Sequence, residues 1–292
     1  MQKNMNQIHQ AKSIPAHLSR DEITRLIKEK VQELRTYTPK VGVFGVTGVG
    51  KSSLCNALFG KEVSPVSDVA ACTREPQEIF IGSDNQGIKL IDVPGVGETI
   101  ERDAEYFELY KQLAPELDLI IWVIKADDRA FAIAEKAYKE ILAPNLQNCP
   151  VVFVINQVDK LCPFNGWDHA HNQPGAEGQI NIDAKVIEVS KAFDTSANKI
   201  ETVSVAANYR LTEVMDKIIE VLPKEKKYSV IKEASDAVKS EGAQIAAEQG
   251  IWETVREYAA GALELVKDVV ADLIVESAPK VLKAIFNKIK FW

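Results

Sequence analysis

The sequence predicts an α/β fold with a mostly parallel six-stranded sheet. Between residues 41 and about 222, short apolar runs alternate with amphipathic segments, as in folds whose helices cover both faces of a parallel sheet. A glycine-rich loop follows the first run, and polar motifs follow several later ones. Ligands of such folds bind at the carboxyl ends of the strands, where these motifs lie. The predicted strands are residues 41–46, 78–81, 88–93, 117–125, 151–156 and 202–205.

The N-terminal region, residues 1–39, is predicted to be a disordered segment followed by one helix. Ser19 and Glu22 have the spacing of a capping box, so the helix begins there. Apolar residues then recur three and four positions apart from Ile23 to Leu34, and Pro39 follows the expected end. The helix therefore has one apolar stripe that needs a partner surface.

The glycine-rich loop, residues 45–52, has the sequence Gly-Val-Thr-Gly-Val-Gly-Lys-Ser between a predicted strand and a predicted helix. Backbone N–H groups of such a loop and the positive end of the next helix surround a phosphate group. Lys51 is expected to reach the β- and γ-phosphate oxygens, and Ser52 to ligate Mg²⁺. The predicted phosphate-binding residues are Gly45, Thr47, Gly48, Val49, Gly50, Lys51, Ser52 and Ser53.

A second motif, Asp-Val-Pro-Gly at residues 92–95, follows the predicted strand 88–93. Asp92 is placed to hold Mg²⁺ through water, and the Gly95 N–H to meet a γ-phosphate. Thr73 lies in a polar connecting stretch, where a threonine can complete the Mg²⁺ shell only while the γ-phosphate is present. We therefore predict Ser52, Thr73 and Asp92 as metal-site residues, and Lys51, Thr73 and Gly95 as catalytic residues.

Two further motifs predict which base the site selects. Asn156, Gln157 and Asp159 follow the predicted strand 151–156, and Ser204, Val205 and Ala206 end the last one. The Asp159 carboxylate can accept hydrogen bonds from guanine N1–H and N2–H₂, which adenine lacks. Leaving a buried carboxylate unpaired costs about 1–3 kcal/mol, or about 10- to 150-fold in preference. The predicted ligands are thus GTP and GDP.

Taken in order, these motifs resemble the Era/TrmE-like GTPases of the TRAFAC class, and most of all the small GTPases carried on bacterial prophages and genomic islands. The resemblance rests on residues 50–59, 63–74, 92–98 and 122–130 and covers about residues 40–222. It implies a P-loop GTPase (G) domain at residues 40–223 that hydrolyses GTP with Mg²⁺. It also implies a nucleotide-dependent switch whose partner is an unknown protein effector or a second copy of the chain.

The sequence departs from this family pattern at several positions. Val96 stands where Ras-like relatives have a glutamine that orients water, so hydrolysis is expected to be slow without a partner or dimerisation. Arg74 and Arg129 are candidates to supply charge in the same chain or across a dimer, although an ordinary surface role is favoured for both. Gln157 and Val205 replace the usual lysine and alanine of the base motifs. Because of Val96, an alternative function is a non-catalytic, GTP-dependent interaction or membrane-associated assembly module.

The C-terminal region, residues 224–292, is predicted to be a helical appendage that joins the N-terminal helix. Its last segment, 279–292, has four lysines, no acidic residue and one apolar stripe. The stripe is expected to pack against helix 18–36 or helix 251–275. Contact with an anionic membrane surface is the alternative, which would place the protein peripherally at the inner membrane face.

Composition narrows the remaining possibilities. The chain has 292 residues and a net charge of −7, which argues against nucleic acid as a main partner but leaves it as a minor alternative. No apolar stretch is long enough to span a membrane, and four cysteines without metal-site spacing favour reduced thiols in a cytoplasmic protein. His169 and His171 lie in the long loop 163–179, where a metal site is a weak alternative to a solvated loop.

Overall fold

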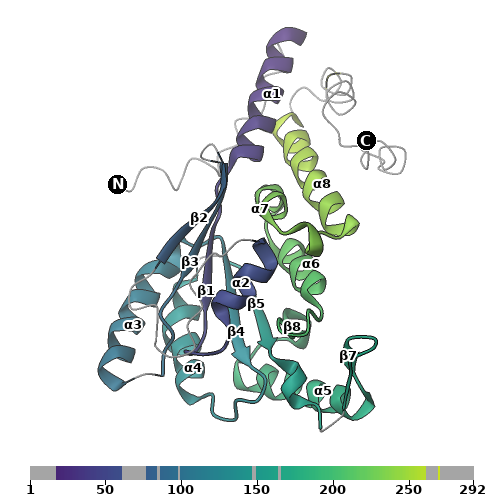
Figure 1. The fold of residues 1–292 in the computed structure, drawn as a ribbon. Helices are drawn as coiled ribbons and strands as arrows, with labels where there is room; N and C mark the ends of the chain where they lie inside the picture. The colour runs from purple at the N-terminus through teal and green to yellow at the C-terminus, as the bar shows by residue number, and fades with distance from the viewer. Residues whose placement is uncertain are drawn as a thin grey trace. The chain divides into compact units, whose positions relative to one another are not determined.

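The computed structural model describes residues 18–60, 77–83, 86–97, 99–146, 149–163, 166–260 and 269 (Figure 1). Contacts between Cα atoms divide the chain into two compact units. The helical unit comprises Met1–Tyr37, Pro223–Tyr228 and Ile245–Trp292, and the sheet unit comprises Thr38–Leu222 and Ser229–Gln244. Residues 229–244 thus group with the sheet, although the sequence placed them in the C-terminal appendage. The domain boundaries at 39/40 and 223/224 stay predictions.

The sheet unit contains a six-stranded sheet in the order β2-β3-β1-β4-β5-β8, which confirms the predicted fold class. Only β2 runs antiparallel to its neighbour, β3, and the other pairs are parallel. All six predicted strands are present, five of them with shifted ends. They are β1 (Lys40–Phe44), β2 (Gln77–Ser83), β3 (Gln86–Asp92), β4 (Leu119–Lys125), β5 (Val151–Asn156) and β8 (Ile200–Val203).

Helices cover both faces of this sheet. The segments packed on one face share a single core with the strands, and α2 and α6 contact each other on the opposite side, where α6 also contacts β5 and β8 (Figure 1). Short 3-10 turns complete the connections. The helices of the first face are α3 (Ile100–Leu113), α4 (Ala132–Lys136) with the π-helix Ala137–Leu142, and α5 (Ala176–Ala192); those of the other are α2 (Lys51–Phe59) and α6 (Leu211–Val221).

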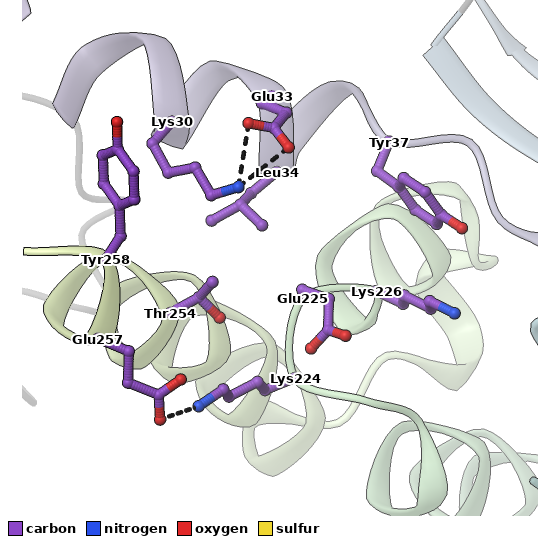
Figure 2. Close-up of a pocket in the computed structure, with 10 residues that line it drawn as sticks. All are labelled: Lys30, Glu33, Leu34, Tyr37, Lys224, Glu225, Lys226, Thr254, Glu257 and Tyr258. Atoms are coloured by element: carbon purple, nitrogen blue, oxygen red, sulfur yellow. Dashed lines mark hydrogen bonds and ion pairs between the residues drawn. The ribbon is translucent and has the colours of Figure 1, made fainter. Parts of the chain in front are cut away.

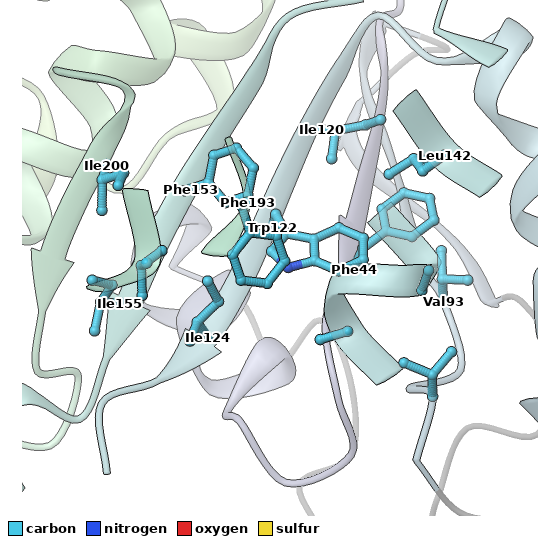
Figure 3. Close-up of a cluster of buried hydrophobic side chains, with 14 of the residues drawn as sticks. Phe44, Val93, Ile120, Trp122, Ile124, Leu142, Phe153, Ile155, Phe193 and Ile200 are labelled. Atoms are coloured by element: carbon cyan, nitrogen blue, oxygen red, sulfur yellow. The ribbon is translucent and has the colours of Figure 1, made fainter. Parts of the chain in front are cut away.

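The core on the first face is aromatic (Figure 3). Trp122, in the middle of β4, is fully buried and stacks on Phe44 of β1 with ring centroids 6.1 Å apart. Tyr138 on the π-helix meets Trp122 edge-on at 5.3 Å and Phe153 at 5.0 Å. Because such ring pairs interact beyond their burial alone, this cluster fixes β1, β4 and β5, whose carboxyl ends carry the motifs.

The sequence predicts one long loop over residues 163–179, a candidate functional or mobile insert, and its assignment as loop throughout is wrong in part. Two short antiparallel strands, β6 (Trp167–Asp168) and β7 (Gln173–Pro174), form a hairpin, and α5 already begins at Ala176. Within the residues that the structure describes, no group of three potential metal ligands is present, so the histidines of this hairpin have no metal partner set.

The helical unit contains α1 (Arg20–Thr36) and most of α8 (Glu241–Tyr258). The capping box is confirmed: the Ser19 hydroxyl accepts a hydrogen bond from the Glu22 N–H, and the Ser19 N–H donates to the Glu22 carboxylate. The apolar stripe of α1 is buried against α8. The buried residues of this core are Ile23, Ile27, Leu34, Ile251, Trp252, Val255, Ala259 and Val269.

A hollow of about 180 Å³ lies on the surface of the helical unit (Figure 2). Its lining has three lysines and three glutamates, so the charges balance. Two pairs of them already bind each other, Lys30 with Glu33 and Lys224 with Glu257. The charged residues are Lys30, Glu33, Lys224, Glu225, Lys226 and Glu257. This balance gives no preference for an anionic or a cationic ligand.

Among the described residues, no helix has the length and apolar character that crossing a membrane requires. The tail 279–292 lies outside the described residues. The packing and membrane hypotheses for this tail therefore both stay predictions.

The helical core predicts a stability effect. Ile27 is fully buried, so Ile27→Ala leaves a cavity and should lower the free energy of unfolding by about 2–5 kcal/mol. Urea unfolding, followed by tryptophan fluorescence that includes Trp252 of this core, measures the change in unfolding free energy. Lys28→Ala, at the adjacent exposed position, is the control and should change little. Equal effects of the two substitutions would show that α1 does not pack as the structure has it.

Candidate nucleotide-binding site

The glycine-rich loop connects the buried strand β1 to α2, and its conformation is compact. Gly50 has a φ of 89°, and a Cβ there would lie 2.6 Å from the amide nitrogen of Asn156. Only glycine combines this left-handed backbone with that close approach. The Lys51 ammonium donates to the carbonyls of Gly45 at 3.2 Å and Val46 at 3.3 Å, so its side chain lies along the loop.

Oxygen ligands meet next to this loop. The Ser52 hydroxyl in the first turn of α2 donates to an Asp92 carboxylate oxygen at 3.3 Å, and Asp92, at the end of β3, is buried. A hydroxyl and a carboxylate are ligands that Mg²⁺ prefers, so the pair fits the predicted metal site. Burial and the neighbouring Asp92 raise the pKa of the Cys55 thiol one turn further on, which keeps it a neutral packing residue.

The motif 92–95 lies directly against the glycine-rich loop. The Thr47 hydroxyl donates to the Gly95 carbonyl at 3.2 Å, and a Cβ on Gly95 would be 2.5 Å from the Thr47 nitrogen. The two backbones thus approach more closely than any side chain allows. Two motifs whose nearest ends, Ser52 and Asp92, are 40 positions apart in the sequence therefore form one surface.

Helix α3 holds the residues on both sides of Gly95. Tyr110 is fully buried, and its hydroxyl donates to the Pro94 carbonyl at 2.8 Å; burial raises the pKa of this hydroxyl, which keeps it a donor. Asp103 accepts a hydrogen bond from the Gly97 N–H at 2.7 Å. Between these contacts Val96 is fully buried in the aromatic core. Its side chain therefore packs against protein and not against a ligand.

Asn156 joins the base motifs to the glycine-rich loop. It is buried, and its amide nitrogen donates to the Val49 carbonyl at 3.0 Å. Its oxygen accepts hydrogen bonds from the N–H of Gln157 at 2.8 Å and of Val205 at 3.4 Å. One side chain therefore holds the ends of β5 and β8 against the loop after β1.

The predicted base-reading residues also come together. Asp159 accepts a hydrogen bond from the buried Ser204 hydroxyl at 2.5 Å. Val205 is half-buried and Ala206 exposed beside them. Gln157 has a left-handed backbone with a φ of 65°, and Lys160 donates to its side chain. The side chain that replaces the family lysine thus has a lysine partner three positions later.

Some predicted residues are not brought together here. Thr73 and Arg74 lie outside the described residues. Ser53 is half-buried in the first turn of α2, and a Cβ on Gly48 would meet no other atom within 4 Å. Arg129 is exposed at a hollow of about 420 Å³ and makes no ion pair or hydrogen bond within the described part of the chain.

Sequence reasoning missed Tyr110, Asp103 and Lys160. Tyr110 and Asp103 read as ordinary residues of an amphipathic helix, and nothing local indicates that they bind the backbone at 94–97. Lys160 follows Asp159 directly, so the missing lysine of the motif was a signal to look for another lysine close by.

Comparisons with known proteins agree with this geometry. Residues 40–157 match the family described as 50S ribosome-binding GTPase. The chain is 37% identical to the uncharacterized protein YkfA of Escherichia coli K12 over 233 residues, 80% of this chain and 79% of YkfA. It is 40% identical to the uncharacterized protein YfjP of the same strain over 209 residues, 72% of this chain and 71% of YfjP. The chain belongs to the Era-like GTPase family.

Within this family the similarity to Era itself is partial. GTPase Era of Aquifex aeolicus is 34% identical over 127 residues, 42% of this chain and 42% of Era. The solved structure of that Era bound to GDP·AlF₄⁻ covers 64% of this chain with a TM-score of 0.47 and 27% identity. The chain spans 57% of that Era chain. The sequence similarity to Era is confined to part of each chain, and residues 40–157 of this chain are the part that matches a GTPase family.

The Tyr110 hydrogen bond predicts a stability effect next to the site. Tyr110→Phe keeps the ring but leaves the buried Pro94 carbonyl without this donor, so we expect a loss of about 1–3 kcal/mol in unfolding free energy. Urea unfolding measures it. Tyr138→Phe is the matched control, because the structure gives its hydroxyl no hydrogen bond within the described residues. If both variants lose the same free energy, the Pro94 contact is not the cause.

Proposed function

We propose that this chain binds GTP with Mg²⁺ and hydrolyses it slowly to GDP and phosphate, so that the bound nucleotide acts as a switch. The family supplies the GTP-binding domain, and the proposal concerns the reaction of this particular chain. Its partner in that role is an effector protein or a second copy.

The hydrogen bonds of Asn156 carry the proposal. They join a loop with the geometry for phosphates to two segments with the chemistry for guanine. Asp159, oriented by Ser204, offers its carboxylate to the guanine N1–H and N2–H₂. An adenine base offers no such pair of donors, so the site favours GTP over ATP.

The residues around the phosphates have separate tasks in the proposed reaction. Lys51 would exchange its contacts to loop carbonyls for β- and γ-phosphate oxygens. Ser52 and Asp92 would hold Mg²⁺, which when bound neutralises charge on those oxygens. The Gly95 N–H would meet the γ-phosphate, and Thr73 is proposed to complete the metal shell.

Water then attacks the γ-phosphorus, and the bond to the β–γ bridging oxygen breaks to leave GDP and phosphate. The side chain of Val96 cannot orient the attacking water, because it is buried and neither donates nor accepts a hydrogen bond. A slow intrinsic rate follows, and an arginine or equivalent group supplied by a partner is worth about 10³–10⁵ in rate.

The burial of Val96 also favours the second candidate function, a GTP-dependent interaction module without useful catalysis. In that case the chain would bind a partner while it holds GTP, and it would release that partner only after the GTP has been exchanged for another nucleotide. The two candidates differ in phosphate release.

Asp159→Asn tests the choice of base. The asparagine oxygen still accepts from Ser204, but the amide no longer accepts two guanine hydrogen bonds, so GDP affinity should fall by about 10- to 150-fold. Calorimetry with GDP and ADP measures this, with the surface substitution Asp183→Asn as control. Wild-type protein that binds ATP as tightly as GTP would remove the specificity claim.

Phosphate release at rising protein concentration tests the reaction. If separate molecules hydrolyse GTP, the rate of phosphate release should rise linearly with protein concentration. If assembly activates hydrolysis, this rate should rise more steeply than linearly. Removal of Mg²⁺ by EDTA and the substitution Lys51→Ala should each abolish it. Absence of release above that of Lys51→Ala at every concentration would favour the interaction module.

A further inference from the structure

The hairpin of residues 167–174, an unexpected element, packs on the loop of residues 204–210, which we term the base loop. The Asn172 amide nitrogen donates to the carbonyl of Ala207 and, at 3.5 Å, to that of Asn208. The Trp167 ring meets the Tyr209 ring edge-on, with centroids 5.2 Å apart and an interplanar angle of 82°. Both rings also lie against the aromatic core.

The base loop passes these contacts on to the predicted base-reading residues. Tyr209 and Ser204 form a backbone bridge, with hydrogen bonds of 2.9 Å and 3.2 Å in the two directions. Ser204 binds the Asp159 carboxylate, and the next N–H, of Val205, binds Asn156. Three successive contacts therefore lead from Trp167 to Asp159.

The backbone of the base loop needs such support. Asn208 and Arg210 have φ values of 50° and 56°, in the left-handed region that costs non-glycine residues energy unless their surroundings enforce it. Arg210 is held by Glu201 at 3.1 Å and by the Thr202 hydroxyl at 3.3 Å. Those contacts secure the end of the loop, while Asn172 reaches its middle.

We propose that the hairpin positions the base loop, so that Trp167 and Asn172 set the affinity for guanine nucleotide through Ser204 and Asp159. The proposal rests on the proposed function, because it concerns the same site. Trp167 and Asn172 are positioning residues: they act on the loop and not on the nucleotide. The phosphate half of the site receives no contact from them in the described structure.

Three variants and one matched control test this role. Asn172 has a φ of 54°, so Asn172→Gly removes the amide without forcing a new backbone conformation. Trp167→Ala removes the ring, and Trp167→Phe keeps an aromatic ring that can still meet the Tyr209 ring edge-on. His169→Ala changes an exposed residue of the same hairpin and serves as control. Calorimetry gives the affinity of each protein for GDP with Mg²⁺ and for pyrophosphate with Mg²⁺.

We expect the GDP dissociation constant to rise about tenfold in Asn172→Gly and in Trp167→Ala, as for the loss of one hydrogen bond or ring contact to the base loop. Trp167→Phe should restore most of the affinity, and His169→Ala should match the wild type. Pyrophosphate affinity should be unchanged throughout, because only the phosphate loop binds it. The kcat for GTP should also be unchanged, while KM rises.

Two results would overturn the positioning role. One is GDP affinity within twofold of wild type in both Asn172→Gly and Trp167→Ala. The other is an equal loss of GDP and pyrophosphate affinity, which would indicate general unfolding of the sheet unit. Wild-type protein that binds pyrophosphate but not GDP would instead contradict the proposed function itself.

Discussion

The side chain of Asn156 is the contact on which the site depends. It is buried at the end of β5, where its amide reaches the carbonyl of Val49 and its oxygen receives two N–H groups. A buried amide with these partners tolerates little movement, because each lost hydrogen bond leaves a polar group in the protein interior. The ends of β1, β5 and β8 are therefore held in one arrangement, and Gly50 must be glycine to let the amide approach.

The opposite side of the glycine-rich loop is organised around the segment that follows β3. Gly95 lies against the loop backbone, and Tyr110 and Asp103 of α3 hold the residues beside it. This anchoring turns Val96 into the core. The same packing that stabilises the segment thus removes the position at which Ras-like relatives orient water. The slow hydrolysis and the need for a partner that we propose would thus follow from this packing and not only from the change of residue type.

Much of this protein was determined by the sequence alone. Apolar runs of strand length, followed by glycine or by polar motifs, predicted all six strands of the sheet and the order of the site residues. The capping box of Ser19 and Glu22 predicted the start of α1. These features depend on hydrophobic periodicity and local hydrogen bonds, which act within a few residues and are therefore readable in the chain.

Tertiary structure decided the contacts between distant segments. Asn156 and Val49 are 107 positions apart, and Asn172 binds the base loop 35 positions later. Tyr110 reads as one more apolar position of a helix until the fold brings its hydroxyl to Pro94. Such contacts depend on strand order and on which helix face meets the sheet. No local pattern encodes them, because their energy comes from groups that meet only after the chain has crossed the sheet.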